Sequence, residues 1–117
     1  MKYPVAIIFF VILILARISV NGQTKFSQET NFVNHLFEIK EFDEASIYLN
    51  SISKKYIHQN DSIQYLLGRS QYLKKEIDLA IPYFEKVNTE NHDLWVASQM
   101  FSSFCNNYKK NYSNAVS

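Results

Sequence analysis

Glycine, proline and cysteine are scarce in this chain of 117 residues, which holds two, two and one of them respectively. The scarcity of glycine and proline argues against collagen-like chains and against all-β folds that need many tight turns. A single cysteine excludes an intramolecular disulfide scaffold and a multi-cysteine zinc ribbon. The formal net charge is only +1, so no concentrated positive charge points to a nucleic-acid partner.

Apolar residues are plentiful by contrast. They make up 47% of the chain and include nine Phe and eight Tyr. This content is enough to bury a core, which argues against intrinsic disorder. The length allows one small domain, and the low Gly and Pro content favours an all-α fold.

The N-terminus has the features of a secretory signal peptide. Lys2 supplies a positive charge, and an apolar run of 12 residues follows from Val5 to Ala16. Val20 and Gly22 are small residues placed three and one positions before a cut. We therefore expect a helical signal peptide at residues 1–22, and a protein exported to the periplasm or the extracellular space.

The alternative is an uncleaved anchor in the inner membrane. An apolar helix of 12 residues rises only about 18 Å, whereas the hydrocarbon core of a bilayer is about 30 Å thick. The membrane is therefore expected to be a partner only if this N-terminal segment stays uncleaved. The junction between Gly22 and Gln23 resembles export signals of Bacteroidota-type bacteria, in which Gln often begins the mature chain.

The rest of the chain repeats an apolar pattern every 35 residues. Four positions with spacings of three, four and three recur in two copies: Phe42, Ala45, Leu49 and Ile52, then Ile77, Ala80, Phe84 and Val87. A third copy begins with Tyr112 and Ala115. This spacing places each set on one stripe of a helix, where the alanine allows a neighbouring helix to approach closely.

Another segment with helical periodicity precedes each of these helices, so each unit is predicted to be a helical hairpin. The turns inside the hairpins are expected at three short polar junctions: Lys40-Glu41, Lys74-Lys75-Glu76 and Lys109-Lys110-Asn111. The predicted units span about residues 26–59, 61–91 and 92–117, the last of them incomplete. Pro82 lies five residues into the second helix of the second unit, where it bends the helix or delays its start to about Leu79.

The second predicted hairpin has a Leu-Gly pair at Leu67-Gly68, an aromatic residue at Tyr72, a small residue at Ala80 and an aromatic residue at Phe84. In these positions it resembles a tetratricopeptide repeat. The resemblance extends over about residues 26–117. It implies a short α-solenoid of antiparallel helical hairpins, whose first helices line a concave groove that binds a protein or peptide.

By this resemblance the groove is lined by three sets of residues, one from each first helix: Thr30, Asn34 and Phe37; Tyr65, Arg69 and Tyr72; Met100, Phe104 and Tyr108. Spacings of four and then three or four also place each set on one helical face. Arg69 is suited to hold a carboxylate or to stack on an aromatic ring. The alternative is that several of these aromatic residues belong to the core between repeats.

No pattern in the sequence indicates catalysis, a cofactor or a metal site. The three histidines have no paired spacing, and Gly68 is the only glycine after Gly22, which excludes a glycine-rich phosphate loop. Three acidic residues are close in sequence but are expected to favour the start of a helix: Glu41, Asp43 and Glu44. Cys105 is expected to be a buried, inert thiol.

These features predict an exported, non-catalytic scaffold that binds a protein or peptide. One alternative is the N-terminal helical part of a larger envelope protein with a nutrient-binding or enzymatic role, and another is a membrane-anchored assembly scaffold. An incomplete third unit is expected to leave its first helix partly uncovered, so a homo-oligomer is a further option. The side chains exposed there are expected to be Trp95, Phe101 or Phe104.

Overall fold

The computed structural model describes the backbone of residues 21–116 and the side chains of residues 25–111. Its elements are five α-helices and one short 3-10 helix, with no strand among the described residues, which confirms the all-α prediction. Residues 1–20 of the predicted signal peptide lie outside the described residues. The chain divides into two compact units, residues 1–32 and 33–117.

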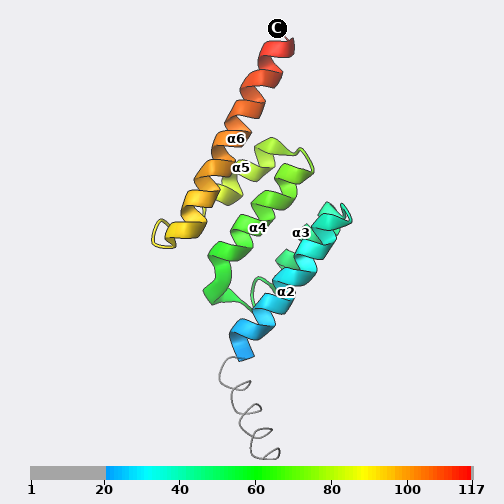
Figure 1. The fold of residues 1–117 in the computed structure, drawn as a ribbon, viewed down its shortest axis with the longest axis vertical. Helices are drawn as coiled ribbons and strands as arrows, with labels where there is room; N and C mark the ends of the chain where they lie inside the picture. Colours follow the sequence, from blue (N-terminus) through cyan, green and yellow to red (C-terminus); the bar gives the residue numbers. More distant parts are fainter. Residues whose placement is uncertain (1–20, 117) are drawn as a thin grey trace, which may run out of the picture. The chain divides into compact units, whose positions relative to one another are not determined.

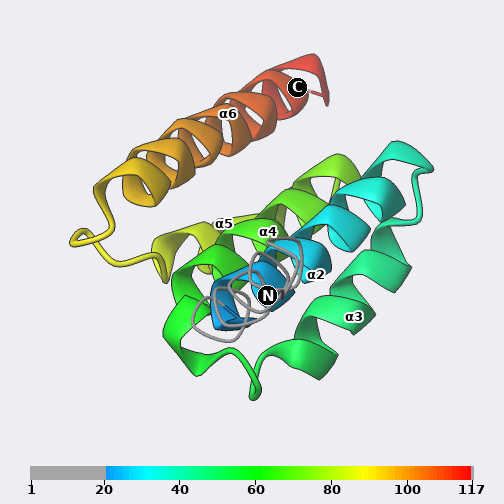
Figure 2. The same ribbon diagram turned by 60° about the horizontal axis from the view of Figure 1, so that its bottom comes forward.

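The helices follow one another with short connections: α2 (Asn21–Glu38), α3 (Phe42–Ile52), η1 (Ile57–Gln59), α4 (Asn60–Leu73), α5 (Ile77–Glu85) and α6 (His92–Val116). In the second unit α4 packs against both α3 and α5, and α6 packs against α5 and α4 (Figures 1 and 2). The C-terminal turns of α6 extend beyond α4 and α5 (Figure 1).

The turn between α2 and α3 is closed by backbone hydrogen bonds around a lysine in the left-handed region. Lys40 has a φ of 63°. Its amide donates to the Phe37 carbonyl at 3.0 Å, and the amide of Glu41 donates to the Leu36 carbonyl at 2.8 Å. This pair of bonds is a Schellman motif, which ends a helix and reverses the chain.

The turn between α4 and α5 has the same geometry 35 residues later. Lys75 has a φ of 68°. Its amide donates to the Tyr72 carbonyl, and the amide of Glu76 donates to the Gln71 carbonyl, both at 2.9 Å. Lysine takes the position that glycine usually holds in this motif.

An ion pair recurs with the same 35-residue offset in both partners. Lys74 Nζ lies 2.5 Å from Asp43 Oδ1, and Lys109 Nζ lies 2.8 Å from Asp78 Oδ1. Each pair joins the first helix of one predicted hairpin to the second helix of the preceding hairpin. The hydrogen bond to Asp43 raises the pKa of Lys74, which keeps this ammonium group charged. Both pairs are exposed, and pairs of this kind add little stability.

The third predicted turn is absent, because α6 continues without interruption through Lys109-Lys110-Asn111 as far as Val116. The prediction of a second helix beginning at Tyr112 is therefore wrong. In α4 the face toward α5 carries Gly68 and Tyr72, and the equivalent positions in α6 are Ser103 and Asn107. The contacts that Gly68 and Tyr72 make with α5 therefore have no equivalent at these two polar positions of α6.

One cluster of the hydrophobic core is built on the buried stripe of α5. Ile77, Ala80 and Phe84 are buried there, with Cys105 of α6. The Phe84 ring stacks on that of Phe101 with centroids 5.4 Å apart and planes inclined by 12°. The helix begins at Ile77 with Pro82 inside it, so the alternative start near Leu79 is wrong.

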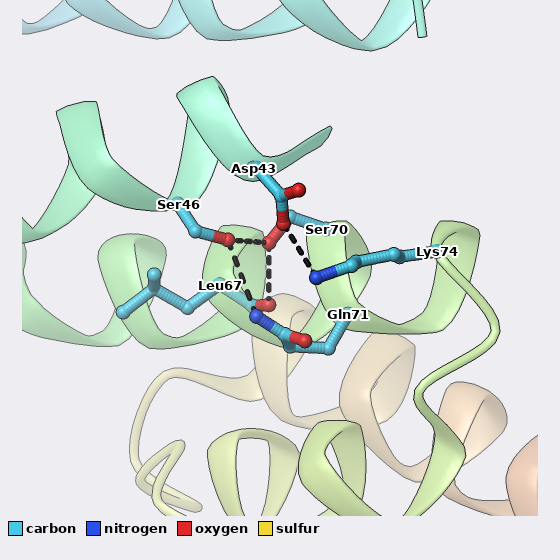
Figure 3. A network of polar contacts seen from close by, with 6 residues as sticks. All are labelled: Asp43, Ser46, Leu67, Ser70, Gln71 and Lys74. Carbon is cyan, nitrogen blue, oxygen red and sulfur yellow. Dashed lines mark hydrogen bonds and ion pairs between the residues drawn. The ribbon is translucent and has the colours of Figure 1, made fainter. Parts of the chain in front are cut away.

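A chain of polar contacts crosses the interface between α3 and α4 (Figure 3). Gln71 Nε2 donates to Ser46 Oγ at 3.3 Å, and Ser46 and Ser70 share a hydrogen bond between their hydroxyls. Ser70 Oγ then donates to the Leu67 carbonyl at 3.0 Å. Ser70 is fully buried, and these bonds compensate for the loss of water around its hydroxyl.

A second buried serine lacks such bonds and gives a stability prediction. Ser98 of α6 is fully buried, and its hydroxyl has no hydrogen-bond partner among the described residues. Ser98→Ala removes an unsatisfied hydroxyl, so we expect it to raise the free energy of unfolding by about 1 kcal/mol. Ser70→Ala breaks a satisfied network and should lower it by about 1 kcal/mol.

Urea unfolding followed by circular dichroism measures both variants. Serine-to-alanine substitution changes the intrinsic helix propensity equally at the two positions, so the difference between the variants reports the hydrogen bonds. Equal losses of stability in both variants would show that the Ser98 hydroxyl has a partner in solution.

Candidate functional site

The predicted groove residues fall on α2, α4 and α6, and the structure brings only some of them together. Thr30 belongs to the first unit, where its hydroxyl donates to the Ser27 carbonyl at 2.9 Å. Asn34 is exposed on α2. The remaining residues of the second unit form two features: a cluster around Arg69 and an apolar stripe on α6.

The Arg69 cluster consists of this arginine and four rings: Phe37, Tyr65, Tyr72 and Phe101. The guanidinium carbon of Arg69 lies 5.4 Å from the ring centroid of Phe37, 5.8 Å from that of Tyr65 and 6.0 Å from that of Phe101. These distances fall within the range of cation–π attraction. Arg69 forms no ion pair within residues 33–111, so ring faces and not a carboxylate surround its charge there.

Phe101 holds the cluster together, although it was not among the predicted groove residues. Its centroid lies 5.9 Å from that of Tyr65, 5.3 Å from that of Tyr72 and 5.8 Å from that of Phe104, in edge-on geometry each time. With its stacking on Phe84, these contacts leave the ring half-buried. The sequence spacing placed Phe101 on the apolar side of α6, but it did not indicate which residues of α4 this ring contacts.

The two tyrosines of the cluster have mixed surroundings. Tyr65 and Tyr72 are half-buried and pack against the core of α5 and α6, which includes Phe84 and Cys105. Their other edges reach the surface beside Arg69. Burial raises the pKa of the Cys105 thiol, which keeps it protonated and weakly nucleophilic.

The α6 stripe consists of four apolar side chains at intervals of four residues. Their exposed fractions are 47% for Val96, 50% for Met100, 43% for Phe104 and 43% for Tyr108. Trp95 and Phe101, in contrast, are half-buried. Of the three side chains expected to be uncovered on this helix, Phe104 is thus the exposed one, and Phe101 instead packs against Tyr65 and Tyr72 of α4 and Phe84 of α5.

The described side chains, those of residues 25–111, offer no cluster of metal ligands. No three His, Cys, Asp or Glu residues lie together in that part of the chain. Among the described helices none is both long enough and apolar enough to cross a membrane. No protein-family model, curated protein or solved structure matches the chain.

Proposed function

We propose that the protein is an exported, non-catalytic scaffold of tetratricopeptide-like hairpins that binds a protein or peptide through the face lined by α2, α4 and α6. One observation carries the proposal: the Arg69 cluster brings together rings from α2, α4 and α6, of which Phe37 is buried and the other three are half-buried around the arginine. The recurrence of the turns at Lys40 and Lys75 and of the two ion pairs supports a solenoid with a 35-residue period.

The chemistry of the Arg69 cluster suits protein recognition. Tyrosine and arginine are enriched among the residues that contribute most to binding at protein interfaces. The neighbouring rings restrict the Arg69 side chain before a partner arrives, which lowers the entropy that binding costs. Arg69 as a whole is only half-buried, and a guanidinium has N–H groups that can donate to a carboxylate or carbonyl of the partner.

A double substitution tests the proposal. Arg69→Ala with Tyr72→Ala should reduce recovery of bound partners from an envelope extract by about 10-fold or more, since it removes two anchors of the kind that dominate interfaces. The matched control is Tyr83→Ala with Lys86→Ala, which removes a similar cation and ring, 5.3 Å apart, from α5. We expect the control to recover the same partners as the unmodified protein.

Circular dichroism must show equal helical content in both double variants. Should the Arg69 and Tyr72 variant lose helix, the single change Arg69→Gln keeps the packing of the side-chain stem and removes only the charge. Unchanged partner recovery in a folded Arg69 variant would overturn the proposed site. Export is tested separately by sequencing the N-terminus of the purified protein, for which we expect Gln23 as the first residue.

A further inference from the structure

The outer surface of α6 differs from an ordinary solvent-facing helix. From Leu94 to Tyr108 this helix contains no charged residue over about four turns. The α6 stripe runs along it, bordered by three exposed and uncharged polar side chains: Gln99, Ser103 and Asn107. Loss of charge together with methionine and aromatic side chains is the composition of the centre of a protein interface.

The two ends of this uncharged surface carry opposite charges. Asp93 is exposed in the first turn of α6, and Lys110 is exposed beyond its uncharged part. Neither forms an ion pair within residues 33–111. A helix with a negative end, an apolar middle and a positive end is complementary to itself when a second copy runs antiparallel, because each end then meets the opposite charge.

We propose that the α6 stripe is the interface of a homodimer, in which two copies of α6 pack antiparallel about a two-fold axis near residue 102. In this register Met100 of one copy faces Phe104 of the other, and Val96 faces Tyr108. Asp93 lies within one residue of the level of Lys110 in the other copy, about 1.5 Å of helix rise. Each contact occurs twice, as a two-fold interface requires.

The size of the stripe sets the strength of the dimer. Four partly exposed side chains form a patch of roughly 300–400 Å², comparable to the largest apolar patch of a typical monomer. Two such patches bury less than the roughly 1,200 Å² of a standard stable interface. The dimer is therefore dynamic, and it forms as the concentration rises. It also occupies Met100 and Phe104, so a partner that extends from the Arg69 cluster onto α6 competes with the second copy.

Analytical ultracentrifugation of the purified protein from about 1 µM to 1 mM tests the dimer, and this range brackets a weak interface. We expect the mass to rise from one chain toward two. Met100→Glu and Phe104→Lys each place a charge in the apolar contact, and each should raise the dissociation constant about 100-fold. An equimolar mixture of the two variant chains should regain the dimer, because the antiparallel register sets the new carboxylate against the new ammonium group.

Ile47→Glu is the control, since Ile47 is exposed on α3 away from the stripe and its replacement should leave the dimer unchanged. A single-chain mass up to 1 mM, or a dimer that persists in the Met100→Glu variant, would overturn the proposed interface. Loss of the dimer in each variant alone, with no recovery in the mixture, would overturn the antiparallel register. None of these results depends on Arg69, so the dimer and the partner-binding face are tested independently of each other.

Discussion

Replacing Phe84 by alanine should lower the free energy of unfolding by about 3–5 kcal/mol, the usual range for a large buried aromatic residue. Phe84 is the largest fully buried side chain of the described residues. Its ring stacks on Phe101 and meets the edge of Tyr65 with centroids 6.1 Å apart, so it contacts both α4 and α6. Urea unfolding followed by far-ultraviolet circular dichroism gives the change.

Leu79→Ala on the same helix is the control. This side chain is 55% exposed, and its truncation should cost less than about 1 kcal/mol. If Phe84→Ala leaves too little folded protein for a measurement, Phe84→Leu keeps most of the volume and should cost about 1.5 kcal/mol. Losses from Phe84→Ala and Leu79→Ala that agree within error would contradict the position of Phe84 in the core.

The core and the candidate site are coupled through one ring. Phe101 stacks on Phe84 in the core and lies under the guanidinium of Arg69 at the surface. Loss of Phe84 therefore removes the support of the cluster as well as stability. A stable and correctly packed α5 is thus a condition for the proposed recognition surface on α4 and α6, even though α5 contributes no residue to that surface.

The helices and the first two turns could be predicted from the sequence, because apolar spacing reports local periodicity. The apolar sets beginning at Phe42 and Ile77 mark the first residues of α3 and α5. The 35-residue offset placed Lys40 and Lys75 at turns, but the left-handed conformation of these lysines could not be foreseen, since side chains other than glycine rarely adopt it. It is imposed by the packing of the helices on both sides.

The third turn was predicted wrongly because similar polar sequences occur once in a turn and once inside a helix. Lys109-Lys110-Asn111 resembles the turn at Lys74-Lys75-Glu76, yet a turn forms only where a second helix can bury its apolar face. At the positions equivalent to Gly68 and Tyr72, which meet α5, α6 has the polar residues Ser103 and Asn107. A tertiary condition of this kind has no signature in the junction itself.

The candidate site was only partly foreseeable for a similar reason. Arg69 and its helix neighbour Tyr65 share a face by spacing alone. Phe37 and Phe101 join them from helices 32 residues away in either direction, and only the packing of the second unit brings these rings within cation–π distance. The sequence suggested that Arg69 stacks on an aromatic ring, but it did not indicate how many rings or which ones.

Gly68→Val should lower the free energy of unfolding by about 3 kcal/mol, the upper range for overpacking. A Cβ atom at Gly68 would lie 2.6 Å from Cε1 of Phe84 and 2.8 Å from two more atoms of the same ring. Real Cβ contacts are longer, and the buried ring has little room to move. The gain in helix propensity from replacing glycine offsets less than about 1 kcal/mol of this cost. Urea unfolding measures the change.

Ser103→Val is the matched control for this clash, because Ser103 is the equivalent position 35 residues later and is exposed on α6. We expect it to change stability by less than about 0.5 kcal/mol. Phe84→Leu removes part of the ring that meets the new side chain. Combined with Gly68→Val it should therefore cost less than the sum of the two single changes, by about 1 kcal/mol or more. If the losses of stability from the two single changes simply add, α4 and α5 separate to admit the valine. The close approach of these helices would then not explain the glycine at position 68.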